Sequence, residues 1–255
     1  MTDDDFEASV EEPGIELKFC IAAIPAMLLI ALAFHASGLG PFLQGAFFAM
    51  PLHELGHATV AWLCGYAAIP TLWHTNVPGE RGLLMPVVVL AGAAYLGVRG
   101  WREERWGRVA FAAALALLEL LGRFLVPEKT AQMLITFAGD GLGMVFATAL
   151  MGSFFFGKDT QLYQGSLRWG FVAIGAAAFV AIFSVWWAAR RDAGRIPFGE
   201  QEHAGPSDAV RLVDWFGWTA DQMVSRYVTL GVLCLLALGA VYAWGVWKAW
   251  EAAEN

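Results

Sequence analysis

Two histidines and a glutamate in one short stretch, His53, Glu54 and His57, carry the clearest chemical signal in this chain. Residues four apart on a helix lie one turn apart on the same face, so both imidazoles can bind one metal ion. This H-E-x-x-H spacing is typical of zinc sites in which the glutamate, placed beside the metal, moves a proton from water. The motif therefore predicts one zinc ion per chain, bound by the two histidines, with Glu54 as the catalytic acid/base.

The motif lies inside an apolar run, residues 41–64, that is long enough to cross a membrane as a helix. A charged group at the centre of a bilayer costs roughly 2.5–3.5 kcal/mol on insertion scales. Two unpaired histidines and a carboxylate are therefore unfavourable in such a helix. A bound divalent cation explains their presence better than chance does.

A catalytic zinc ion has three protein ligands and one open position, so the two histidines need a partner. Asp140 is the preferred candidate, because an ionised carboxylate in the middle of the apolar run 130–156 needs a cation nearby. Glu119 is the main alternative, although it can instead form a salt bridge with Arg123 one turn away.

Two further histidines remain as weaker candidates for the third ligand. His35, at the end of an apolar run, is more typical of a packing residue that is hydrogen-bonded within the fold. His74 and Asn76, in the segment after the motif, are candidates for contacting a substrate, and His74 is also a possible alternative ligand.

The composition indicates an integral membrane protein, since 58% of the residues are hydrophobic and only 15% are charged, against about 25% charged in a soluble domain. We expect an all-α, polytopic bundle of six or seven spanning helices with a short irregular or β-hairpin segment, 65–82, after the motif helix. The expected spans are 17–37, 41–64, 83–100, 109–126, 130–156, 167–189 and 227–247.

Four regions follow from this pattern. Residues 1–16 hold seven acidic residues and no Lys or Arg, which predicts a disordered acidic tail. Residues 17–189 form the expected membrane core, and 227–255 a last spanning helix and tail. The loop 190–226 contains an expected amphipathic helix at the membrane interface, which starts at Ser207 and Asp208 because both residues can cap a helix N-terminus.

The membrane-embedded H-E-L-G-H helix, the broken segment after it and the distant Asp140-Gly141 pair together resemble the site-2-protease family of intramembrane zinc metalloproteases. The Ala- and Gly-rich stretch 90–97 resembles the helix that packs beside the zinc helix in that family. The resemblance covers roughly residues 42–153. It implies a zinc metalloendopeptidase, without a PDZ domain, in which His53, His57 and Asp140 bind zinc and Glu54 is catalytic.

The leading hypothesis is thus a hydrolase that cuts transmembrane segments of membrane-protein substrates. The alternatives are a zinc-binding pseudoprotease scaffold and a proton-coupled transporter that uses the buried acids. We expect a lipid bilayer and a membrane-protein substrate as partners, and no nucleic acid. The expected location is a prokaryotic plasma membrane, crossed several times, and the distribution of Arg and Lys between the loops favours a cytoplasmic N-terminus.

Overall fold

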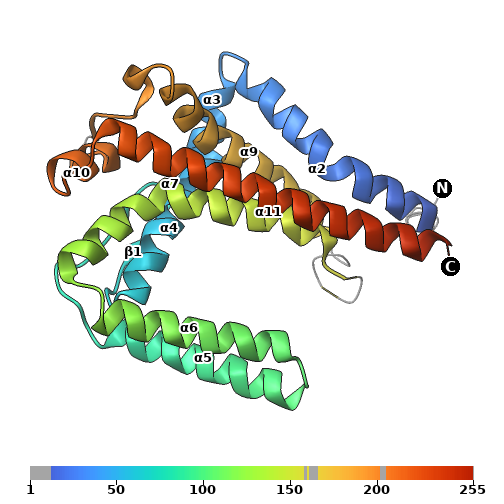
Figure 1. Ribbon diagram of the computed structural model, residues 1–255, viewed down its shortest axis with the longest axis horizontal. Coiled ribbons are helices and arrows are strands. Elements are labelled where there is room, and N and C mark those ends of the chain that lie inside the picture. The colour runs from blue at the N-terminus through green and yellow to red at the C-terminus, as the bar shows by residue number, and fades with distance from the viewer. Residues whose placement is uncertain (1–12, 158–159, 161–165, 202–204, 255) are drawn as a thin grey trace. The chain divides into compact units, whose positions relative to one another are not determined.

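The computed structural model describes residues 13–157, 160, 166–201 and 205–254, and almost all of its regular structure is helical (Figure 1). The chain forms two compact units from interleaved segments. Residues 1–52, 143–196 and 224–255 belong to the first unit, and residues 53–142 and 197–223 to the second. The helices α4, α7 and α11 pass from one unit to the other.

The first unit is built on long apolar helices. Helix α2 packs against α9, and α9 also contacts the π-helical turn η1. Most residues of α9 between Val172 and Ala189 are buried. The elements of this unit are α2 (Pro13–His35), α3 (Gly40–Gln44), η1 (Gly45–Ala49), the second half of α7 (Glu128–Gly152), η2 (Ser153–Phe155), α9 (Leu167–Ala189), η3 (Ala193–Arg195) and most of α11 (Ala220–Glu254).

The second unit contains the H-E-x-x-H motif. Helices α5 and α6 form an antiparallel hairpin in it (Figure 1). Strands β1 and β2 pair antiparallel, with Ile69 opposite Asn76. The elements are most of α4 (Met50–Leu63), β1 (Ile69–Pro70), β2 (Thr75–Asn76), α5 (Leu84–Arg102), α6 (Trp106–Phe124), the first half of α7, β3 (Glu200–Gln201), β4 (Gly205–Pro206) and α10 (Asp208–Asp214).

Five of the described helices are long and apolar enough to cross a membrane, which indicates an integral membrane protein. They are α2, α5, the segment Glu128–Phe155 that contains α7, α9 and α11. The other two expected spans are also helical. Residues 41–64 correspond to α3, η1 and α4 in succession, and residues 109–126 correspond to α6. The π-helical turn η1 widens the helix directly before the motif, and such turns are frequent next to functional sites.

Two boundaries differ from the expected ones. Helix α2 begins at Pro13, so residues 13–16 of the expected acidic tail are helical, and Glu16 forms an ion pair with Arg168 of α9. Residues 1–12 lie outside the described part of the chain.

The expected single amphipathic helix after residue 207 is divided into α10 and the start of α11. Gly217 adopts a left-handed φ of 71° and its N–H bonds to the carbonyl of Val213, which ends α10. Thr219 and Gln222 then form a reciprocal capping box that starts α11. Gly217 and the Thr219–Gln222 pair are local features of the sequence, so the sequence alone could have predicted the break between α10 and α11.

Candidate metal centre

The H-E-x-x-H motif lies where α4 crosses α7. A Cβ added to Gly56 would lie 2.3 Å from the carbonyl oxygen of Ala138, and one added to Gly139 would lie 2.6 Å from Cε1 of His53. The backbones approach this closely because both residues lack a side chain. The crossing therefore lays the backbone of α7 directly over the two imidazoles.

The same crossing fixes which nitrogen of each imidazole carries the proton. Nδ1 of His57 lies 2.7 Å from the carbonyl oxygen of Ile135, and Nδ1 of His53 lies 2.8 Å from Oδ1 of Asp140. A carbonyl and a carboxylate can only accept, so both Nδ1 atoms are the donors. In the neutral rings, each Nε2 is left with a free lone pair, which is the form that binds a metal ion.

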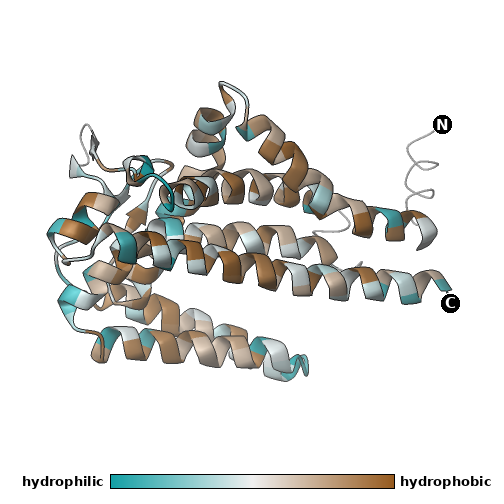
Figure 2. Ribbon diagram, turned by 45° about the horizontal axis from the view of Figure 1, so that its top comes forward, coloured by the Kyte–Doolittle hydropathy of each residue, from teal (hydrophilic) through white to brown (hydrophobic). Residues whose placement is uncertain are grey.

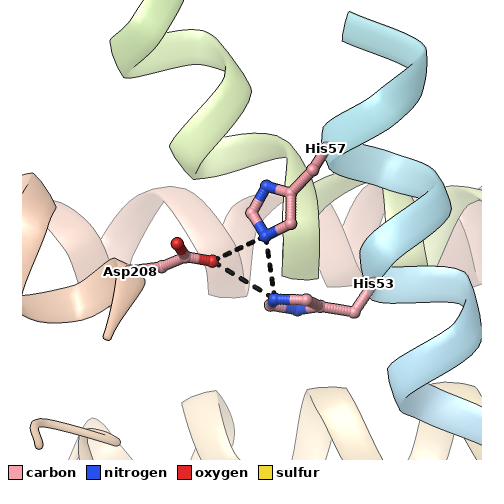
Figure 3. Close-up of side chains that lie close together, drawn as sticks. All are labelled: His53, His57 and Asp208. Carbon is pink, nitrogen blue, oxygen red and sulfur yellow. Dashed lines mark hydrogen bonds and ion pairs between the residues drawn. The ribbon is translucent and has the colours of Figure 1, made fainter. Parts of the chain in front are cut away.

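The two Nε2 atoms point toward each other and toward a carboxylate from α10, as Figure 3 shows. They lie 2.9 Å apart, and Oδ2 of Asp208 lies 2.9 Å from Nε2 of His57 and 3.2 Å from that of His53. Burial opposes ionisation of Asp208, but positive charge on the imidazoles of His57 and His53 outweighs burial and lowers the pKa of this carboxyl well below its usual range. A positive charge at this point, from protonated imidazoles or from a bound cation, therefore keeps the carboxylate ionised.

This arrangement fits a divalent cation. Nε2 of His53, Nε2 of His57 and Oδ2 of Asp208 all carry lone pairs, so they repel one another unless a proton or a cation lies among them. A single proton forms a hydrogen bond between only two of the three atoms. In a tetrahedral zinc site with bonds of about 2.0–2.1 Å, ligand atoms lie about 3.3–3.4 Å apart. The three separations fall within about 0.5 Å of that value. His53, His57 and Asp208 are thus a group that could hold a metal ion.

Asp140 lies beside His53 but is not in this converging group. It was expected to be the third ligand, yet it contacts Nδ1 of His53, on the side of the ring away from His57 and Asp208. A carboxylate that accepts the N–H of a ligating histidine orients the ring and raises its basicity. In the described geometry, Asp140 is placed for this orienting role.

Asp208 was not among the candidate ligands expected from the sequence, because those candidates lie in the apolar runs and in the segment after the motif. Ser207 is the N-cap of α10, since its hydroxyl accepts the N–H of Val210. Asp208 is therefore the first helical residue and is free to reach outward from the helix end. The indole of Trp218, just after α10, contacts Met133 and Phe137 of α7, which attaches this loop to the site.

Glu54 is buried on α4, directly after His53 in sequence. Its backbone carbonyl accepts the hydroxyl of Thr75, at 2.9 Å. Because Thr75 belongs to β2, this bond attaches the β1–β2 pair to the turn of α4 that carries the motif. The pair therefore lies beside the candidate metal centre.

The remaining candidates lie apart from the converging atoms. His74 and Asn76 are exposed in and beside β2, and Nδ1 of His35 bonds to Gln44, as expected of a packing histidine. Glu119 is fully buried on α6, and the expected ion pair with Arg123 is not among those of the described residues. Arg123 instead lies over Gly65.

Comparison of the chain with family models, with curated proteins and with solved structures finds no match.

Proposed function

We propose that this chain is an intramembrane zinc metalloprotease that hydrolyses peptide bonds in the transmembrane segments of other membrane proteins. The observation that carries the proposal is the convergence of three lone-pair atoms, from His53, His57 and Asp208, beside a buried Glu54 in a chain of apolar helices. The resemblance of the motif to site-2 proteases supports the same reaction class.

In this proposal, His53, His57 and Asp208 hold the zinc ion, and Asp140 keeps the ring of His53 in place. When bound, zinc acts as a Lewis acid that polarises a peptide carbonyl and activates water. Glu54 accepts a proton as the water oxygen forms its bond to the carbonyl carbon. It then gives that proton to the leaving amine nitrogen as the peptide C–N bond breaks.

A transmembrane helix has to unwind before it can be cut, because its carbonyls are bonded within the helix. An extended substrate can recover these bonds by pairing with an exposed strand edge. The β1–β2 pair is a suitable partner, since the hydroxyl of Thr75 attaches it to the carbonyl of Glu54, and Ile69 on β1 is 64% exposed. We propose this pair as the substrate-binding edge.

A proton-coupled transporter is the second candidate, and Glu119 is the observation that favours it. Both carboxyl oxygens of Glu119 are buried and have no hydrogen-bond partner within the described residues. Buried acids in membrane segments often relay protons. A transporter would move protons or a solute across vesicles without needing a stoichiometric metal ion.

The Glu54→Gln variant separates these functions. Purified protein in proteoliposomes is given a single-span reporter whose membrane segment contains Gly and Pro. We expect wild type to cut the reporter, and Glu54→Gln to cut it about 10²–10⁴-fold more slowly while keeping its zinc. Glu128→Gln, the same change at an exposed position on α7, serves as the control and should leave the rate unchanged.

Three results would contradict the proposal. Cleavage by Glu54→Gln at the wild-type rate would remove Glu54 from the reaction. Zinc-loaded wild type that cuts no reporter would favour the scaffold, and metal-independent proton uptake in place of cleavage would favour the transporter.

A further inference from the structure

The turn between α5 and α6 concentrates positive charge on a chain whose net charge is −7. Four arginines and two glutamates lie within ten residues there: Arg99, Arg102, Glu103, Glu104, Arg105 and Arg108. The turn is tight, since Glu104 adopts a left-handed φ of 55° and the N–H of Arg105 bonds to the carbonyl of Gly100. The arginines are therefore held close together.

Three of these arginines share one carboxylate. Nε of Arg99 lies 2.6 Å from Oε1 of Glu103, Nε of Arg105 lies 3.6 Å from its Oε2, and Arg108 bonds to the same Oε2. The Arg99 guanidinium also holds the pKa of the Glu103 carboxyl below its usual range, so Glu103 stays ionised. One negative charge faces three positive ones, and the cluster keeps unneutralised guanidinium groups that favour a further anion.

Aromatic side chains flank this cluster. The rings of Trp101 and Trp106 meet edge to face, with centroids 5.0 Å apart, and both residues are more than 60% exposed. Farther from the turn along the two helices, Val98 on α5 and Phe111 on α6 are also exposed. Figure 2 shows that hydropathy changes along the α5–α6 hairpin, from apolar helices to a hydrophilic turn.

We propose that the α5–α6 turn binds the phosphate headgroup of an anionic phospholipid. Guanidinium groups match phosphate oxygens in geometry and charge. Exposed tryptophans at the end of an apolar helix pair are typical of the level where hydrocarbon meets headgroups. This inference is independent of the proposed protease activity.

A lipid fits the turn better than an acidic protein does. The apolar surface below the arginines continues along both helices, and an acyl chain covers such a surface while its phosphate stays at the turn. An acidic peptide supplies the negative charge but leaves Val98 and Phe111 uncovered.

Native mass spectrometry of the full-length protein in neutral detergent tests this proposal. The probes are phosphatidylglycerol and phosphatidylcholine with the same acyl chains. We expect wild type to bind phosphatidylglycerol about ten-fold more tightly, because arginines near an anionic headgroup attract its net negative charge. The double variant Arg105→Gln/Arg108→Gln should lose this preference, and Arg102→Gln, whose guanidinium lies outside the bonds to Glu103, should lose part of it.

The control is Arg191→Gln/Arg195→Gln, which removes the same charge from an exposed loop and should keep the preference. Equal binding of both lipids by wild type, or equal loss in the control and in the Arg105/Arg108 variant, would overturn the proposal. Full competition by inorganic phosphate or by a polyglutamate peptide at matched charge would also overturn it, because neither probe has an acyl chain.

Discussion

The two ring nitrogens of His53 face two different carboxylates. Nδ1 donates to Asp140, and Nε2 faces Asp208 together with Nε2 of His57. One acid therefore orients the ring and the other completes the group of atoms that converge. The two roles follow from which side of the imidazole each carboxylate occupies.

Gly139 sets the space available to both rings. A Cβ at this position would lie 2.6 Å from Cε1 of His53 and 2.7 Å from Nε2 of His57. We predict that Gly139→Ala displaces the imidazoles and lowers zinc affinity by at least about ten-fold. Changes to the surroundings that orient ligating histidines typically lower metal affinity by about 10–100-fold. Isothermal titration of the metal-stripped protein with zinc measures this change.

Gly92→Ala is the control for Gly139→Ala. Gly92 lies on α5 with nothing within 4 Å of its added Cβ, so alanine there should leave zinc affinity unchanged. Equal zinc affinity in Gly139→Ala and wild type would show that the α4–α7 crossing does not position the rings.

At the scale of elements, α2 and α9 are joined by a buried ion pair. The Arg168 guanidinium donates two bonds to the Glu16 carboxylate, at 2.6 and 2.9 Å, and the side chain of Arg168 is 4% exposed. The ring of Phe154 lies under the same guanidinium, 4.7 Å away. Removing the carboxylate takes two charge-assisted bonds away from this buried guanidinium, and breaking a buried ion pair from one side is strongly destabilising.

We predict that Glu16→Gln lowers the free energy of unfolding by about 3–5 kcal/mol. Thermal unfolding in detergent, followed by tryptophan fluorescence, measures the loss. Asp192→Asn, which breaks the exposed ion pair with Arg195, should change stability by less than about 1 kcal/mol. An equally small effect of Glu16→Gln would contradict a stabilising role for the buried pair.

For the whole molecule, the sequence was sufficient for the class of fold, because long apolar runs have few alternatives to spanning helices. It was also sufficient to expect that His53 and His57 converge, since their spacing along one helix is fixed by helical geometry. The catalytic role of Glu54 stays a prediction. The start of α10 agrees with the cap expected at Ser207. The number of spans stays a prediction, as does the cytoplasmic N-terminus.

The placement of Asp208 could not be read from the sequence. Its contact with His57 spans 151 residues and depends on how α10 lies against α4, which no local pattern encodes. The positions of Asp140 and Asp208 around the His53 ring have the same origin. Both are acids, and only the packing decides which side of the His53 ring each one reaches.

The metal content of the purified protein tests the central claim, that His53, His57 and Asp208 together hold one zinc ion. Elemental analysis is made on wild type, His57→Ala, Asp208→Ala, Asp140→Asn and the control Asp214→Ala, which changes an exposed acid of the same short helix. We predict one zinc per chain in wild type and in Asp214→Ala, and almost none in His57→Ala and Asp208→Ala. Asp140→Asn should bind zinc about 10–100-fold more weakly. Full zinc occupancy in Asp208→Ala, or wild type without zinc after purification in its presence, would contradict the account.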